Sequence, residues 1–154
     1  LCNQHGLDRF YPTDPGARAM VDNAMFYLIG TFYPLIARAT YPTLGFPQYP
    51  GEVATSDADD AMKAQAQQDA EAALAEPLDV FNSYFIGDQA FIGGEQPSIA
   101  DIRLAATLEF LRAIDYAFPQ WAEDYMRRME DSLGEAYSEP AGDVRGFVAS
   151  VKSG

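Results

Sequence analysis

The stretch Gln96-Pro97-Ser98-Ile99-Ala100-Asp101-Ile102 predicts the start of a buried helix. Pro97 ends the preceding segment, and Ser98 is a residue type that caps helix N-termini well. The Asp101 carboxylate can reach back to the Ser98 backbone N–H while the Ser98 hydroxyl accepts from the Asp101 N–H. The run that follows, 99–114, is apolar on nearly every face, and a helix of that kind belongs inside a domain. We therefore assign Ser98 and Asp101 to structural capping and not to catalysis.

The rest of the chain predicts an all-α fold of five to six helices around this buried central helix. Asp14-Pro15 is a strong helix start, Pro34 should bend the end of the first helix, and Gly134 should stop a later one. No strand pattern competes. Helices are expected over 15–37, 56–85, 98–115, 119–133 and 142–152, with an irregular Pro- and Gly-rich loop over 41–55.

Composition narrows the class of protein. The 154 residues suffice for one domain with a real core, and 48% hydrophobic residues exclude a disordered chain. Ten Lys and Arg against 23 Asp and Glu give a net charge of −13, which disfavours nucleic acid and anionic membranes as partners. The longest apolar stretches are too short for a membrane span. One His and one Cys, without ligand-like spacing, predict no metal site.

The single cysteine allows no intrachain disulfide, so we expect a reducing intracellular compartment, cytoplasmic or organellar. The chain begins with Leu1 and shows no signal peptide. We therefore interpret it as a processed product or as a piece of a longer chain.

Three stretches carry a resemblance to a known family. They are 7–33, with Tyr11-Pro-Thr-Asp-Pro-Gly-Ala-Arg-Ala-Met-Val-Asp22 and Gly30-Thr-Phe-Tyr33; 91–111, with the capping residues; and 118–129. In order and content they resemble the C-terminal helical domain of glutathione S-transferases, closest to the delta and theta classes. In that family a thioredoxin-like domain comes first and holds the glutathione site and the thiol-activating residue. The resemblance implies that 1–13 is the end of that domain and a linker, and that 14–154 is the helical domain.

The resemblance also implies where a site should lie. Aromatic residues of the first helix and its end, here Phe26, Tyr27, Tyr33 and Tyr41, would line the pocket for a hydrophobic electrophile; ordinary core or dimer surface is the alternative. Arg18 and Asp22, four residues apart, can pair on one helix face and would lie near the dimer cleft and glutathione; a solvated ion pair is the alternative. No catalytic residue and no cofactor are expected in this chain. Glutathione is expected only if the full-length protein is a transferase.

Three functions remain open at this point. We favour a non-catalytic structural or interaction module within a larger assembly. The alternatives are the C-terminal half of an active transferase that conjugates glutathione to hydrophobic electrophiles, and a carrier of apolar small molecules. In each of the first two, residues 10–33 should contact a protein partner or a twin, with Phe26, Ile29, Phe32 and Tyr33 partly open in the isolated chain.

Overall fold

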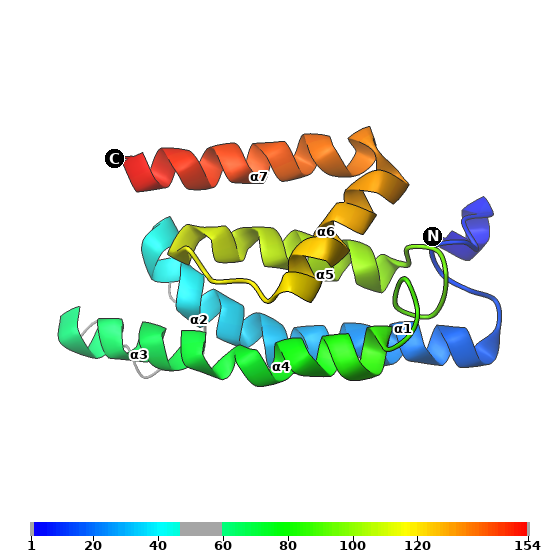
Figure 1. Cartoon of the computed structure of the whole chain (residues 1–154), viewed down its shortest axis with the longest axis horizontal. Helices are drawn as coiled ribbons and strands as arrows, with labels where there is room; N and C mark the ends of the chain where they lie inside the picture. Colours follow the sequence, from blue (N-terminus) through cyan, green and yellow to red (C-terminus); the bar gives the residue numbers. More distant parts are fainter. Residues whose placement is uncertain (1, 47–59, 154) are drawn as a thin grey trace.

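Five helical rods make up the part of the chain that the computed structural model describes, residues 2–46 and 60–153 (Figure 1). A short 3₁₀ turn, η1 (Cys2–His5), precedes them, and the only β pairing in this part is an isolated bridge between Phe91 and Gly94. The prediction of an all-α fold with five to six helices is therefore confirmed. The rods are α1 (Pro15–Tyr27) with η2 (Leu28–Phe32) and α2 (Tyr33–Leu44); α3 (Asp60–Ala73) with α4 (Ala75–Val80) and η3 (Phe81–Ile86); α5 (Ile99–Phe110) with η4 (Leu111–Ile114); α6 (Gln120–Leu133); and α7 (Glu135–Ser153).

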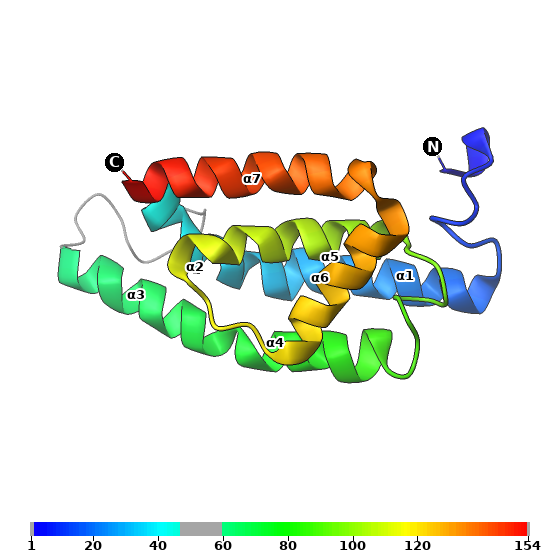
Figure 2. The same ribbon diagram turned by 45° about the horizontal axis from the view of Figure 1, so that its top comes forward.

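The rod that begins with α5 lies at the centre of the bundle and contacts α1, α2, α6 and α7. The first two rods run side by side along the long axis, α7 lies on the other side of α5, and α6 crosses obliquely (Figures 1 and 2). Leu104, Ala105 and Leu108 of α5 are completely buried. One stripe of α5, which includes Ile102 and Arg103, is exposed, so this helix is less enclosed than its composition predicted. The remaining faces of α5 are buried against the surrounding helices.

The first rod extends further than the sequence predicted, to Leu44 instead of residue 37. Pro34 has no N–H to offer the Gly30 carbonyl and its ring crowds that carbonyl, so the helix widens into the π turn η2 just before it. Tyr33 N–H accordingly donates to the Leu28 carbonyl. Helical structure then resumes and ends only at Gly45, whose φ of 67° is left-handed. The start of the expected loop, 41–44, is therefore helical, and its later part lies outside the described residues.

The last helix also differs from the expectation. It begins at Glu135 and not at 142, because Gly134 ends α6 with a φ of 56° and α7 starts directly after it. Tyr137 and Ser138 N–H both donate to the Gly134 carbonyl, at 3.0 Å each. Pro140 lies inside α7 on an exposed position. The second rod ends at Ile86, close to the predicted residue 85, whereas its predicted start at 56 lies outside the described residues.

Gly93, in the segment before α5, is held where no side chain fits. Its φ is 86°, and a Cβ there would lie 3.1 Å from Val21 Cγ2 and 3.3 Å from the Ala17 carbonyl oxygen. Val21 is completely buried and cannot move aside. We expect Gly93→Ala to lower the free energy of unfolding by about 2 kcal/mol, from the positive φ and the contact together.

Chemical denaturation measures this loss directly. Gly146→Ala in α7 is the matched control, because a Cβ there meets nothing within 4 Å; it should leave stability unchanged or raise it by up to about 1 kcal/mol. Equal midpoints for the two variants would contradict the close approach of the 91–94 turn to α1.

Candidate functional site

The Ser98–Asp101 pair forms the capping box at the start of α5 and is tied to two other elements. Ser98 N–H and Oγ–H donate to Asp101 Oδ2 at 2.7 and 2.6 Å, and Asp101 N–H donates to Ser98 Oγ at 3.4 Å. Asp101 Oδ1 accepts from Ile92 N–H at 2.8 Å and from the Tyr125 hydroxyl at 2.7 Å. Asp101 is 0% exposed, and burial raises the pKa of its carboxyl although these donors oppose the shift. A carboxylate with every oxygen engaged by the protein is a structural anchor.

The four aromatic residues expected to form one pocket divide into separate environments. Tyr27 packs inward, with its ring centroid 5.6 Å from that of Phe81 and 5.4 Å from that of Phe85. Phe26, its neighbour on α1, is 78% exposed. Phe26 and Tyr27 thus face different sides of the rod, because adjacent residues on a helix point about 100° apart. That these aromatic residues line a pocket stays a prediction.

Tyr33 and Tyr41 lie together further along the same rod. Their hydroxyl oxygens are 2.8 Å apart, and the Arg103 guanidinium carbon from α5 lies 5.4 Å from the Tyr33 ring centroid. The two tyrosines are half-buried, so each presents a polar edge at the border of the bundle. Arg103 is a residue that sequence reasoning missed, since nothing in the pattern of α5 indicates that its exposed stripe reaches α2.

Phe26, Ile29 and Tyr33 define what we call the α1 face. Their spacing of three and four residues places them on one side of the rod. Ile29 is 55% exposed, and a Cβ on Gly30 would meet nothing within 4 Å, so this side of η2 is open. Phe32, expected to be partly open, is completely buried against Phe81, at 5.3 Å between ring centroids. The α1 face is therefore narrower than predicted but keeps its two most exposed apolar side chains.

Arg18 and Asp22 do not pair with each other among the described residues. Arg18 Nε donates to the Pro12 carbonyl at 2.7 Å, and Asp22 accepts from the Tyr11 hydroxyl at 2.9 Å. The Arg18 guanidinium also lies 4.6 Å from the centroid of the Tyr11 ring, so Tyr11 separates the two charges. The hydrogen bond to Asp22 raises the pKa of Tyr11. With Ile99 N–H bonded to the Phe10 carbonyl at 2.8 Å, these contacts fasten the N-terminal segment onto α1 and α5.

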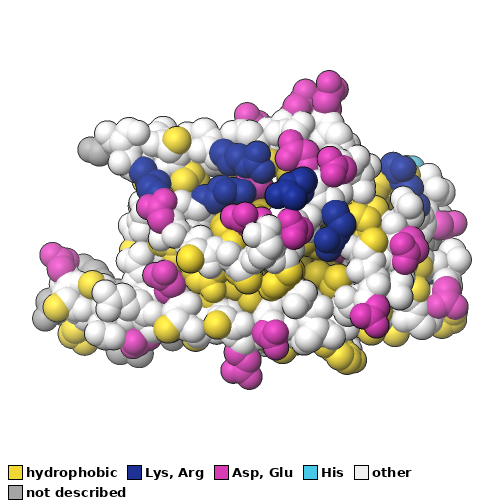
Figure 3. All heavy atoms as spheres, in the orientation of Figure 1, with side chains coloured by type: hydrophobic (Ala, Val, Ile, Leu, Met, Phe, Trp, Pro, Cys, Tyr) yellow, Lys and Arg dark blue, Asp and Glu magenta, His cyan; other side chains and the backbone are white. Residues whose placement is uncertain are grey.

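Glu109 forms a second buried charge that the sequence did not single out. It is 1% exposed; Arg145 Nη2 donates to its Oε1 at 2.6 Å and Arg112 Nε to its Oε2 at 2.7 Å. The Tyr137 hydroxyl completes the group at 3.0 Å from Oε1. Burial favours the neutral acid, but the hydrogen bonds from Arg145 and Arg112 outweigh it and lower the pKa of Glu109. Lys and Arg side chains gather on this side of the molecule in Figure 3.

Within 2–46 and 60–153, no three His, Cys, Asp or Glu side chains converge in a way that could hold a metal ion. In the same ranges no helix has both the length and the apolar character needed to cross a membrane.

The fold defines an all-helical domain whose first rod leaves Phe26 and Ile29 exposed. Residues 64–131 match the family model described as glutathione S-transferase, C-terminal domain. Glutathione S-transferase D6 of Drosophila melanogaster is 27% identical over 117 residues, which cover 75% of this chain and 46% of that protein. These matches support a C-terminal-type helical domain of the glutathione S-transferase family.

Solved structures agree with this fold. Human glutathione transferase theta-2, in complex with glutathione and an unknown ligand, superposes with a TM-score of 0.70 at 21% identity, over 99% of this chain and 60% of that one. A delta-class glutathione transferase of Nilaparvata lugens gives a TM-score of 0.61 at 25% identity, over 95% and 62% of the two chains. The chain thus spans about half the length of the curated relative it matches.

Proposed function

We propose that this chain is the helical half of a glutathione transferase, and that its α1 face is the apolar wall on which a hydrophobic electrophile is held. The observation that carries the proposal is the exposure of Phe26 and Ile29, 78% and 55%, on a rod whose other large side chains are mostly covered. Large side chains exposed side by side are typical of a surface that a ligand or partner covers. In this proposal residues 1–13 link the domain to a thioredoxin-like unit that activates the thiol of glutathione.

The chemistry of conjugation assigns thiol activation and binding of the electrophile to different groups. The glutathione thiolate attacks the electrophilic carbon and displaces its leaving group, so a group that lowers the thiol pKa is required. The α1 face offers apolar surface, with the hydroxyls of Tyr33 and Tyr41 and the Arg103 guanidinium at its border. These residues can orient an electrophile and interact with its polar substituents. In this proposal none of these residues activates the glutathione thiol.

A second function, a non-catalytic interaction module in a larger assembly, is supported by the charge of the chain. A net charge of −13 favours a partner that surrounds its contact with Lys and Arg. Such an association would weaken as salt is added, because the Debye length shortens from about 10 Å at 0.1 M to about 3 Å at 1 M.

One conjugation assay separates the two functions. The 154-residue chain is tested with glutathione and 1-chloro-2,4-dinitrobenzene, alone and together with a separately expressed thioredoxin-like domain of a delta-class relative. Alone, the chain should show no turnover above the uncatalysed rate. With the added domain, the transferase proposal expects a complex in light scattering and measurable turnover. A complex without turnover favours the interaction module, and the absence of both complex and turnover rejects the transferase proposal.

The double variant Phe26→Ser, Ile29→Ser should weaken this complex, or the kcat/KM of the complex, by at least about tenfold. Removing two exposed apolar side chains takes away roughly 1–3 kcal/mol each of burial free energy when the face is covered, but little from the folded chain alone. Met62→Ser on α3 is the control, because Met62 is also more than half exposed, at 52%, and lies outside the α1 face. Equal losses in the two variants would mean that the contact is not specific to α1.

A further inference from the structure

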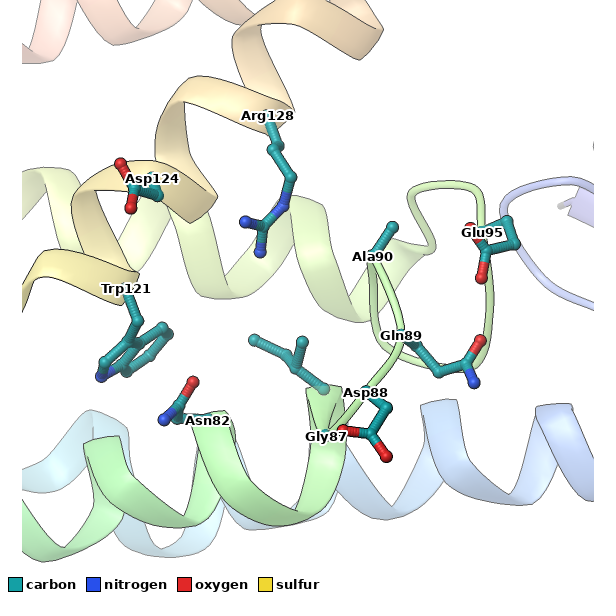
Figure 4. Close-up of a pocket in the computed structure, with 10 residues that line it drawn as sticks. Asn82, Gly87, Asp88, Gln89, Ala90, Glu95, Trp121, Asp124 and Arg128 are labelled. Atoms are coloured by element: carbon teal, nitrogen blue, oxygen red, sulfur yellow. The ribbon is translucent and has the colours of Figure 1, made fainter.

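A groove runs between α6, the end of η3 and the segment that follows η3, and none of the α1 face residues line it. We call it the α6 groove; its volume is about 500 Å³, within the range of roughly 300–1,000 Å³ typical of small-molecule sites. Asn82 and Ile86 of η3, Trp121 and Arg128 of α6, and Ala90 line it. In Figure 4 Arg128 lies above Asn82, with Trp121 and Ala90 on opposite sides of the space between them. Family resemblance and the proposed function leave these residues without a role.

Arg128 is the only cation among the described residues that line this groove. Its Nε is buried and has no hydrogen-bond partner among the described residues. Its guanidinium carbon lies 5.8 Å from the ring centroid of Tyr125, whose hydroxyl is already used by Asp101. In Figure 4 the guanidinium extends from α6 into the space bordered by Trp121 and Asn82. An acceptor placed there would meet a planar fork of N–H donors, which matches a carboxylate well.

Trp121 gives the groove an apolar, flat side. It lies seven residues before Arg128 on α6, and its ring centroid is 6.4 Å from that of Tyr125, so the three side chains follow one another along the helix. The buried Ile86 and the amide of Asn82 face it from η3. The indole ring offers a flat apolar surface to a planar ligand, and in Figure 4 its nitrogen lies on the side away from Arg128.

The remaining lining residues restrict the charge of a ligand. Asp88 and Glu95 lie on the segment after η3, and Asp124 accepts from Arg127 Nη1 at 3.0 Å and from Gln120 at 3.1 Å. In Figure 4 these three carboxylates lie around the space into which Arg128 extends and not inside it. They repel an anion in proportion to its charge, so a ligand with a single carboxylate suits the groove better than a phosphate or another polyanion.

From this arrangement we propose that the α6 groove binds a planar aromatic monocarboxylate, with its carboxylate on Arg128 and its ring between Trp121 and Ile86. The site is independent of the α1 face and of the conjugation chemistry proposed above. It makes the domain a carrier or sensor of such acids whether or not a thioredoxin-like unit is attached.

Trp121 is the only tryptophan of the chain, so its fluorescence reports on this groove directly. The test is a titration of the 154-residue chain with benzoate, which should change the Trp121 emission saturably. Benzamide, the neutral analogue, and inorganic phosphate should not. Arg128→Met keeps the side-chain length but removes the charge, and should weaken benzoate binding by about tenfold or more, since a charge-assisted hydrogen bond contributes about 1.5–3 kcal/mol.

Arg9→Met is the control, because Arg9 is an exposed cation that does not line the groove. It should bind benzoate like the wild type. Far-ultraviolet circular dichroism checks that both variants fold, and Asn82→Ala serves as a second variant with an expected loss of about threefold or more. An unsaturable response, equal binding by benzamide or phosphate, or equal affinity of the Arg128→Met and wild-type chains would overturn the proposal.

Discussion

Asp101→Ala is expected to lower the free energy of unfolding by at least about 4 kcal/mol. The substitution removes the acceptor of Ile92 N–H, Ser98 N–H and the Tyr125 hydroxyl, at 2.8, 2.7 and 2.7 Å, in a place with no exposure to water. Each buried donor left without a partner costs about 1–3 kcal/mol. Total stabilities of single domains are about 5–15 kcal/mol, so the variant should be close to unfolding.

Thermal unfolding followed by circular dichroism measures the effect. A loss of 4 kcal/mol corresponds to a fall in Tm of roughly 8–16 °C in a chain of about this length. Ser98→Ala, which removes only the cap side chain, should cost about 1–2 kcal/mol, and Asp131→Ala on the exposed side of α6 should cost almost nothing. A loss below about 1 kcal/mol for Asp101→Ala would show that the buried network does not form.

Glu109→Gln is expected to produce the second-largest loss, about 2–3 kcal/mol at neutral pH. Breaking a buried ion pair by changing one partner costs about 3–5 kcal/mol when both charges are buried. The side chains of Arg112 and Arg145 are 38% and 39% exposed, so solvent can compensate them in part and the lower figure applies. Denaturation by urea at pH 7 gives the difference between the variant and the wild type.

The same variant should reveal a pH dependence. Because the folded-state pKa of Glu109 is lowered, its contribution is complete above the unfolded pKa, about 4.3, and is lost as pH falls through the lower folded value. The stability difference between wild type and Glu109→Gln should therefore shrink between pH 5 and pH 3. Taking the difference removes the titration of the other carboxylates. A difference that grows toward acid pH would contradict the assigned role of the two arginines.

Local rules were sufficient for the features that depend on neighbours in the chain. The capping box follows from the spacing of Ser98 and Asp101, and the left-handed stop at Gly134 from the type of residue. The order of helices could be predicted because apolar periodicity and Pro and Gly positions are properties of short windows. The helix bounds that were predicted wrongly also have local causes. The π turn η2 accommodates Pro34, so α2 continues past residue 37, and Gly134 ends α6 so sharply that α7 begins directly after it.

The features that concern function were decided by distant parts of the chain. Sequence periodicity places Trp121 and Arg128 on one side of α6, but only the packed fold brings Asn82 and Ile86 opposite them. In the same way Tyr125 reaches Asp101 from 24 residues away, and Arg145 reaches Glu109 from 36. Phe26 and Phe32 are equally apolar in the sequence, yet one is exposed and the other completely buried. Helix propensity and capping act within a few residues, whereas burial and charge pairing depend on which helices pack together, and that is set by the tertiary structure.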